Sequence, residues 1–276
     1  MPPQAVGVLY RPDHPEARRL AYDIAAMLKA HGVRVFFDPE SPPPPGFPSL
    51  TEVSISPEIV IAVGGDGTIL RCLRRYDVPI LAVMLGHRCL LGEVVPGEVR
   101  EAVERLIADD YYIEEFRKLR VLVAEQSFLA ANEVVICSSR HFRMLWADVK
   151  LGELRYRIAS DAIIVATSLG STAHALSAGG PVIYPDLDCL VIVAVCPLEK
   201  TPALVIPSNQ EIVIDIDGRD YPVTLIVDGE IVSRELPSHT ELRIRMARKT
   251  SKFVRFKRPP SLRRIGQALV TLSAHL

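Results

Sequence analysis

The order of apolar segments in the first 38 residues constrains the fold more than any other feature of this chain. "AVGVLY" (5–10) has the composition of a buried strand, and "VRVFFD" (33–38) has that of the next one. Between them, apolar residues recur at helical spacing from His14 to Ala30, and Gly32 follows as a stop signal. So few residues allow only a crossover between the two strands, which predicts a parallel sheet.

The pattern continues after an interruption at 39–49. "PESPPPPGFPS" holds four consecutive prolines, which fit neither a helix nor a central strand, so we expect an extended surface loop there. The following elements are expected as a strand at 58–63, a turn at "GGDG", a helix from Thr68, a strand at 78–85 and a helix near 98–108.

From about Tyr112 the pattern changes to short Val- and Ile-rich stretches separated by turn residues. We therefore expect an α/β N-terminal domain with a parallel Rossmann-like sheet (1–112) and a mostly β C-terminal domain (113–254). The basic, amphipathic tail, about 255–276, is expected to form a solvated closing helix or to pack back on the first domain.

Composition excludes several classes of protein. The chain is 49% hydrophobic and 24% charged with a net charge of -1, which is typical neither of a disordered chain nor of a basic nucleic-acid binder. Its apolar runs are too short to span a bilayer, and the N-terminus lacks a signal-peptide pattern, so we expect a cytoplasmic protein with no membrane or nucleic-acid partner. The five cysteines form no C-x-x-C pair, which favours buried small residues over metal ligands.

The loop "VGGDGT" follows a buried strand and precedes a helix. Its glycines allow close approach of the backbone to a ligand, and the free N–H groups of a helix start favour phosphate. It matches neither the dinucleotide fingerprint nor the Walker pattern, and it has no lysine. Asp66 is then either a general base for a hydroxyl nucleophile or a turn residue that caps the following helix.

Two further stretches could meet a polar ligand. "LGSTAHALSAGG" offers hydroxyls and backbone amides, although Ser171 or Thr172 could equally cap a helix over 173–178. In "AANEVVI", Asn132 and Glu133 interrupt an apolar stretch, so they need polar partners or a turn in water.

Taken in this order, GGDGT, the NE pair, an aspartate separated by ten residues from the threonine of "GSTA", then "SAGGP" and "PDLD" resemble the NAD kinase family. That family transfers a phosphoryl group to the 2′-hydroxyl of the adenosine ribose of NAD. The resemblance implies Asp66 as the base, ATP or polyphosphate as donor, Mg2+ or another divalent cation, and a homodimer or homotetramer whose subunits share the NAD site. The positions it implies for nucleotide binding are Gly64, Gly65, Gly67, Thr68, Arg71, Asn132, Glu133, Asp161, Thr172, Ala173, His174 and Ser177.

The chain departs from the family pattern around the expected NAD pocket. "TSLGST" replaces T-P-T-G-S-T, His174 replaces a tyrosine, "LGHRCLLG" replaces LG-x-LGFL, and Leu198 replaces a frequent histidine. These changes are expected to affect affinity and substrate range more than phosphoryl transfer. Two alternatives remain: a lipid kinase that shares the GGDGT loop, and a non-catalytic NAD(P)-binding sensor.

Overall fold

The structure is a computed structural model that describes residues 2–52, 55–86, 89–140, 143–217 and 222–256. The chain forms two units, one of residues 1–115 with the described residues after 250, and one of residues 116–250. It enters the second unit within β5 (Tyr112–Val123) and returns within β16 (Glu241–Arg255). The expected tail helix falls mostly on residues 257–276, which lie outside the described residues.

The first unit contains the predicted parallel sheet, in the order β2-β1-β3-β4 with one end of β16 beside β4. The strands are β1 (Ala5–Tyr10), β2 (Arg34–Phe37), β3 (Ile59–Gly64) and β4 (Ile80–Met84). Val6 of β1 pairs with Val35 of β2 and with Ile59 of β3, and both pairings are parallel. Strands β1, β3 and β4 are buried throughout, which confirms the buried strands predicted at β1 and β3.

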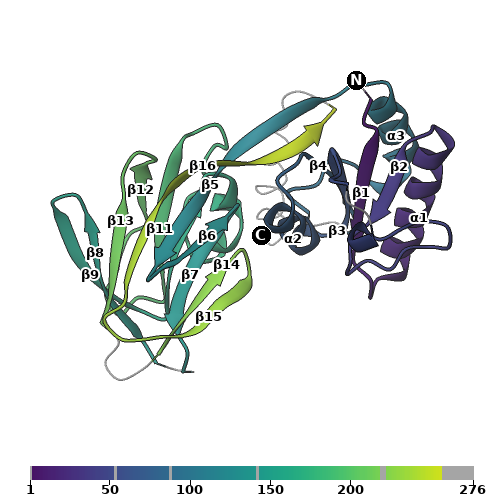
Figure 1. The fold of residues 1–276 in the computed structure, drawn as a ribbon. Helices are drawn as coiled ribbons and strands as arrows, with labels where there is room; N and C mark the ends of the chain where they lie inside the picture. The colour runs from purple at the N-terminus through teal and green to yellow at the C-terminus, as the bar shows by residue number, and fades with distance from the viewer. Residues whose placement is uncertain (1, 53–54, 87–88, 141–142, 218–221, 257–276) are drawn as a thin grey trace. The chain divides into compact units, whose positions relative to one another are not determined.

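Helices cover this sheet (Figure 1). α1 (Pro15–Ala30) and α3 (Val99–Ile107) share a core with Ile59, Ile61 and Val63 of β3. The intervening residues of β3 point to the opposite face and are also buried, and α2 (Asp66–Arg75) contacts β3 and β4. Short 3-10 turns lie at Leu50–Glu52 and Pro96–Glu98.

The proline-rich segment is a loop, as predicted, and polar contacts tie its start to the sheet. Asp38 is 1% exposed, accepts the Glu40 N–H at 2.9 Å and binds the Arg75 guanidinium at 2.6 Å. Ser41 accepts the Tyr10 N–H at 2.9 Å and donates its hydroxyl to the Tyr10 carbonyl at 3.0 Å. The start of the loop is therefore fixed by hydrogen bonds of the buried Asp38 and Ser41, although its prolines have no N–H group to donate.

The second unit is built of antiparallel strands, which confirms the mostly β expectation. One sheet has six strands in the order β12-β11-β10-β7-β14-β15. The other pairings join strands in the order β16-β13-β8-β9 and join β5 to β6 in a hairpin. The remaining strands are β6 (Gln126–Ala130), β7 (Glu133–Ser138), β8 (Leu145–Leu151), β9 (Leu154–Ser160), β10 (Ala162–Thr167), β11 (Cys189–Val195), β12 (Leu204–Pro207), β13 (Ile212–Asp217), β14 (Val223–Val227) and β15 (Glu230–Leu236).

The central strands of the six-stranded sheet are buried on both faces. Val134 and Ile163 lie in the core shared with strands β5, β8, β13 and β16. Val135 and Ile164 lie on the other face, where Ala175 and Ile183 of the segment after β10 cover them. This double burial explains why β10 and β11 are continuous apolar runs instead of alternating patterns.

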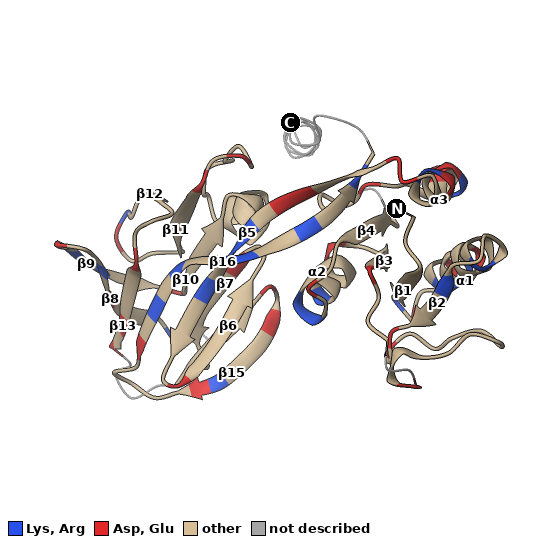
Figure 2. Cartoon of the chain, turned by 45° about the horizontal axis from the view of Figure 1, so that its top comes forward, with Lys and Arg blue, Asp and Glu red and all other residues tan. Residues whose placement is uncertain are grey.

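Charges of both signs are interspersed on the surface, for example along α1 and α3 (Figure 2). No helix in the described part of the chain is long and apolar enough to cross a membrane. Of the five free cysteines, Cys72, Cys89 and Cys189 are buried, Cys137 is half-buried and Cys196 is exposed.

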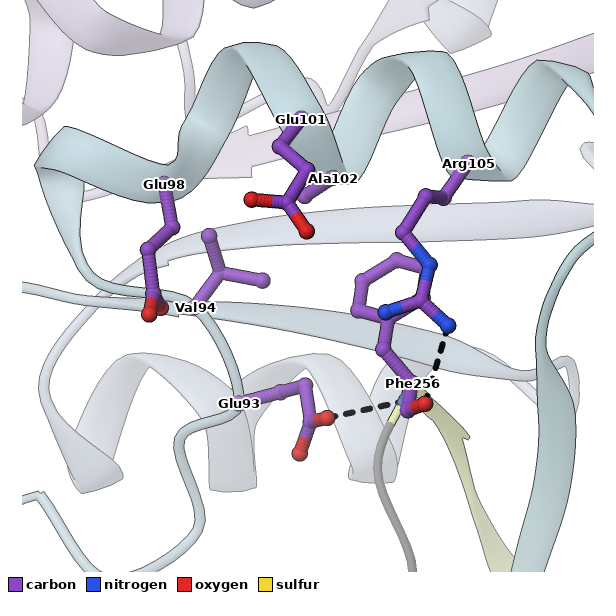
Figure 3. Close-up of a pocket in the computed structure, with 7 residues that line it drawn as sticks. All are labelled: Glu93, Val94, Glu98, Glu101, Ala102, Arg105 and Phe256. Atoms are coloured by element: carbon purple, nitrogen blue, oxygen red, sulfur yellow. Dashed lines mark hydrogen bonds between the residues drawn. The ribbon is translucent and has the colours of Figure 1, made fainter.

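A buried arginine holds the end of β16 inside the first unit. Arg255 is 1% exposed and donates to Glu114 at 2.8 Å and to Glu93 at 3.2 Å. Glu93 also accepts the Phe256 N–H at 2.9 Å at the floor of a shallow pocket whose rim includes Arg105 of α3 (Figure 3). Arg105 donates to the Phe256 carbonyl at 2.9 Å, so Glu93 and Arg105 of this pocket both secure the returning strand.

We predict that Arg255→Met lowers the free energy of unfolding by about 3–5 kcal/mol, because it leaves two largely buried carboxylates without their cation. Guanidinium-induced unfolding measures this. Arg248→Met, at an exposed position of the same strand, is the control and should change stability by less than about 0.5 kcal/mol. Equal losses in the two variants would contradict the assigned role of Arg255.

Candidate functional site

The glycine turn after β3 leads directly into α2. Gly65 is the extended N-cap residue and Asp66 is the first helical residue, so the helix begins two residues earlier than the predicted Thr68. A Cβ on Gly64 would lie 2.5 Å from Thr68 Oγ1, so this position requires glycine for steric reasons. At Gly65 and Gly67 a Cβ would meet nothing within 4 Å, so the turn leaves open space at the helix N-terminus.

The Asp66 carboxylate is held by the segment that follows β4. Leu90 N–H donates to Oδ2 at 3.1 Å, Leu91 N–H donates to Oδ1 at 3.0 Å, and the Cys89 thiol donates to Oδ1 at 3.1 Å. The N-cap of α2 is Gly65, and no side chain caps this helix. The interpretation of Asp66 as a helix cap is therefore wrong, and its carboxylate instead binds a separate segment of chain.

Arg71 is engaged by groups of the first unit. Its guanidinium pairs with Glu40 at 3.1 Å and donates to the Tyr10 carbonyl at 3.3 Å. Thr68 is buried with its N–H bonded to the Gly65 carbonyl at 2.9 Å. Among these positions of the first unit, Gly65 and Gly67 border open space, whereas Thr68 bonds to the turn and Arg71 bonds to Glu40 and Tyr10.

In the second unit, Asn132 and Glu133 lie at the start of β7 and are 5% and 7% exposed. Their backbone is held by Asp228, which accepts N–H groups from Ala131 at 2.7 Å, Asn132 at 2.8 Å and Glu133 at 3.2 Å. Sequence reasoning missed Asp228. The available signal was "DG" between two strands, because Asp228 and Gly229 both have positive φ in a two-residue hairpin turn.

The NE pair keeps polar atoms available for a ligand. Asn132 Oδ1 and Glu133 Oε2 are buried and have no hydrogen-bond partner among the residues that the structure describes. Burial, and secondarily the nearby Asp228 carboxylate, raises the pKa of Glu133 to about 8. Buried polar atoms are normally satisfied in folded proteins, so the unused oxygens of this pair favour a bound polar ligand over a structural role alone.

The segment after β10 packs tightly against the NE pair. The Thr167 hydroxyl donates to the Ala131 carbonyl at 2.7 Å and accepts the Gly170 N–H at 3.0 Å. A Cβ on Gly170 would lie 2.2 Å from the Asn132 carbonyl oxygen, so only glycine allows this approach. The segment therefore carries Thr172 and the residues after it into the neighbourhood of Asn132.

The expected helix over 173–178 is a 3-10 turn (Leu169–Thr172) followed by one helical turn (His174–Ser177). Neither Ser171 nor Thr172 caps that turn, because its N-cap is Ala173. Ser171 is buried and donates to the Ser168 carbonyl at 2.7 Å, whereas Thr172 and Ala173 are half-buried and His174 and Ser177 are exposed. The exposed members are thus free to contact a ligand.

Asp161 is placed apart from this group. It precedes β10, whereas Thr167 ends the strand and the 3-10 turn follows it, so about 20 Å of strand separates the two ends. The register agrees, because Ala166 of β10 lies opposite Glu133 while Ala162 lies opposite Cys137. Within one chain, Asp161 does not share a site with the NE pair.

Two family models match most of the chain, and several known proteins are similar to it. The model of the ATP-NAD kinase N-terminal domain matches residues 50–111, and that of the ATP-NAD kinase C-terminal domain matches residues 131–256. The NAD kinase of Thermococcus sibiricus is 37% identical over 259 residues, covering 91% of this chain and 93% of its own length. That of Pyrococcus furiosus is 34% identical over 262 residues, with coverage of 91% and 93%.

Solved structures show the same architecture. An NAD kinase from Archaeoglobus fulgidus in complex with ATP superposes with a TM-score of 0.76 at 25% identity, covering 96% of this chain and 98% of that one. Yeast NADH kinase complexed with NADH gives a TM-score of 0.85 at 22% identity, covering 98% and 88%, which supports the fold. The chain belongs to the NAD kinase family.

The raised pKa of Glu133 predicts a pH-dependent stability. In the folded state the Glu133 carboxyl keeps its proton up to about pH 8, whereas in the unfolded state it loses the proton near pH 4.5. The protonated carboxyl therefore makes its full contribution to the free energy of unfolding below pH 4.5, and this contribution is lost as the pH rises to about 8. Between pH 5 and pH 9 the loss should be on the order of 4 kcal/mol. Glu133→Gln should lack this contribution, and chemical unfolding of both proteins across that range measures the difference. Parallel pH curves would show that Glu133 titrates normally.

Proposed function

We propose that this protein transfers the terminal phosphoryl group of ATP to the 2′-hydroxyl of the adenosine ribose of NAD, forming NADP. The observation that carries the proposal is the Asp66 carboxylate, which is held by three donors beside an open glycine turn at the start of α2. A carboxylate held in this way beside a phosphate-favouring turn can accept the proton of a hydroxyl nucleophile.

Phosphate binding without a lysine is consistent with this turn. The first turn of α2 has N–H groups with no partner inside the helix, and the helix dipole favours negative charge at that end. The absence of Cβ atoms at Gly65 and Gly67 lets a phosphate approach those N–H groups closely. We assign the donor phosphates to this turn.

NAD binding is assigned to the second unit. The unpartnered oxygens of Asn132 and Glu133 can accept or exchange hydrogen bonds with ribose hydroxyls and amide groups of the dinucleotide. Thr172, Ala173, His174 and Ser177 follow the close approach of Gly170 to Asn132 and supply further contacts. Stacking on the flat imidazole of His174 offers less area than a tyrosine ring would.

The expected Mg2+ fits a site completed by the nucleotide. Among the described residues, no group of three or more His, Cys, Asp or Glu side chains is arranged to hold a metal ion. Mg2+ commonly binds through substrate phosphates with only one or two carboxylates, so the ATP phosphates would hold it here. When bound, it would neutralise charge on the phosphates and leave proton acceptance to Asp66.

The direct test is NADP formation by the purified protein with Mg2+, using ATP or polyphosphate as donor and NAD or NADH as acceptor. A diacylglycerol acceptor assayed beside NAD tests the lipid-kinase alternative. We expect turnover with ATP and NAD. Normal NAD binding by calorimetry with no transfer from any donor would support the sensor alternative instead.

We predict that Asp66→Asn lowers kcat by several orders of magnitude, about 10³-fold or more, because the amide cannot take the proton. NAD binding measured by calorimetry should remain within about twofold, since the substitution is nearly isosteric. Asp109→Asn, in the turn after α3, is the control and should keep full activity. A variant at Asp66 with wild-type turnover would remove this residue from the mechanism.

The isolated position of Asp161 supports a homo-oligomer in which one subunit supplies Asp161 to the NAD site of its neighbour. Asp161 is exposed and lies at the far end of β10 from Thr172. The resemblance assigns both residues to NAD contacts. A closed dimer or tetramer reconciles the two facts, because symmetry gives every subunit a neighbouring copy of Asp161.

Subunit complementation tests this sharing. Asp66→Asn and Asp161→Ala proteins should each have low activity alone, whereas a mixture unfolded and refolded together should regain about a quarter of the wild-type rate. Half of randomly formed dimers are mixed, and each mixed dimer holds one intact site. Activity no higher than the average of the two separate variants would mean that each subunit works alone.

A further inference from the structure

The two oxygens of Asp66 are not equivalent. Oδ1 accepts two hydrogen bonds, from the Cys89 thiol and the Leu91 N–H, and Oδ2 accepts one, from the Leu90 N–H. A carboxylate has about four lone-pair sites in all. Within the described residues, Oδ1 is therefore fully used, and Oδ2 retains a lone pair.

The Cys89 side chain is a hydrogen-bond donor and not a thiolate. It is 3% exposed, and burial together with the negative charge of Asp66 raises the pKa of its thiol above the usual range. A thiolate at this position would face the carboxylate at 3.1 Å and repel it. The proton therefore stays on sulfur and points to Oδ1.

A third donor matters because a carboxylate rotates easily. The torsion that turns an aspartate carboxylate is broad and roughly two-fold, so two backbone donors alone leave room for movement. The buried Cys89 side chain supplies the remaining restraint from outside the helix.

We propose that Cys89 is a positioning residue that occupies Oδ1 of Asp66, so that Oδ2 receives the proton of the acceptor hydroxyl. This inference rests on the proposed phosphoryl transfer. In that step the hydroxyl O–H bond breaks as its oxygen bonds to the terminal phosphorus. The phosphorus–oxygen bond to the leaving nucleoside diphosphate breaks with its electron pair, and the proton goes to Oδ2.

Kinetics of three variants of the full-length protein test the proposal. Cys89→Ala removes the donor and should lower kcat about tenfold, the effect of losing one hydrogen bond to a charged group, with both KM values within about twofold. Cys89→Ser keeps a donor of similar reach and should recover kcat to within about twofold of wild type. Cys189→Ala removes a buried thiol from β11 in the other unit and should leave kcat unchanged.

Three outcomes would overturn it: wild-type kcat in Cys89→Ala, a Cys89→Ser variant as slow as Cys89→Ala, or a loss confined to KM. The contact itself is tested without turnover by infrared spectroscopy. The S–H stretching band assigned to Cys89, from the wild-type minus Cys89→Ser difference, should shift to the free-thiol position in an Asp66→Ala background. An unshifted band refutes the contact. If the wild type forms no NADP, the proposed function fails, while a shifted band still establishes that the thiol holds Asp66.

Discussion

A carboxylate that accepts backbone N–H groups of a separate segment is the interaction on which the candidate residues of each unit depend. Asp66 holds residues 90 and 91 in this way, and Asp228 holds residues 131 to 133. Hydrogen bonds to an ionised acceptor are about twice as strong as neutral ones, and loss of the acceptor leaves several N–H groups unsatisfied at once. Each aspartate therefore fixes a loop that regular secondary structure does not reach.

These two contacts also link the site to the packing around it. The Leu91 carbonyl accepts from the buried Arg255 at 3.4 Å, so the segment that holds Asp66 is itself tied to the returning strand β16. In the second unit, the close approach of Gly170 to Asn132 ties the segment after β10 to the same backbone that Asp228 holds. The polar residues of the site are thus supported by groups that contact no expected ligand.

Most of the fold followed from patterns along the chain, whereas several site contacts did not. The parallel sheet, the proline-rich loop and the mostly β second half were predictable, because periodicity and prolines act locally. The helix start at Asp66 was placed two residues late, because the glycines obscured the first turn. Asp228 was missed because its partners lie 95 to 97 residues away, and a DG hairpin turn alone does not reveal what its carboxylate accepts.

The sequence by itself determined the order of the strands and helices, the two-part organisation and the residues that resemble the NAD kinase family, since each depends on residue type and spacing. Tertiary structure decided that Asp66 binds the 89–91 segment instead of capping α2, that Arg71 pairs with Glu40, and that Asp161 lies at the far end of β10 from Thr172. These facts depend on contacts between groups that lie far apart in the sequence. Local sequence pattern does not encode such contacts, because it reflects only residue type and spacing within one segment.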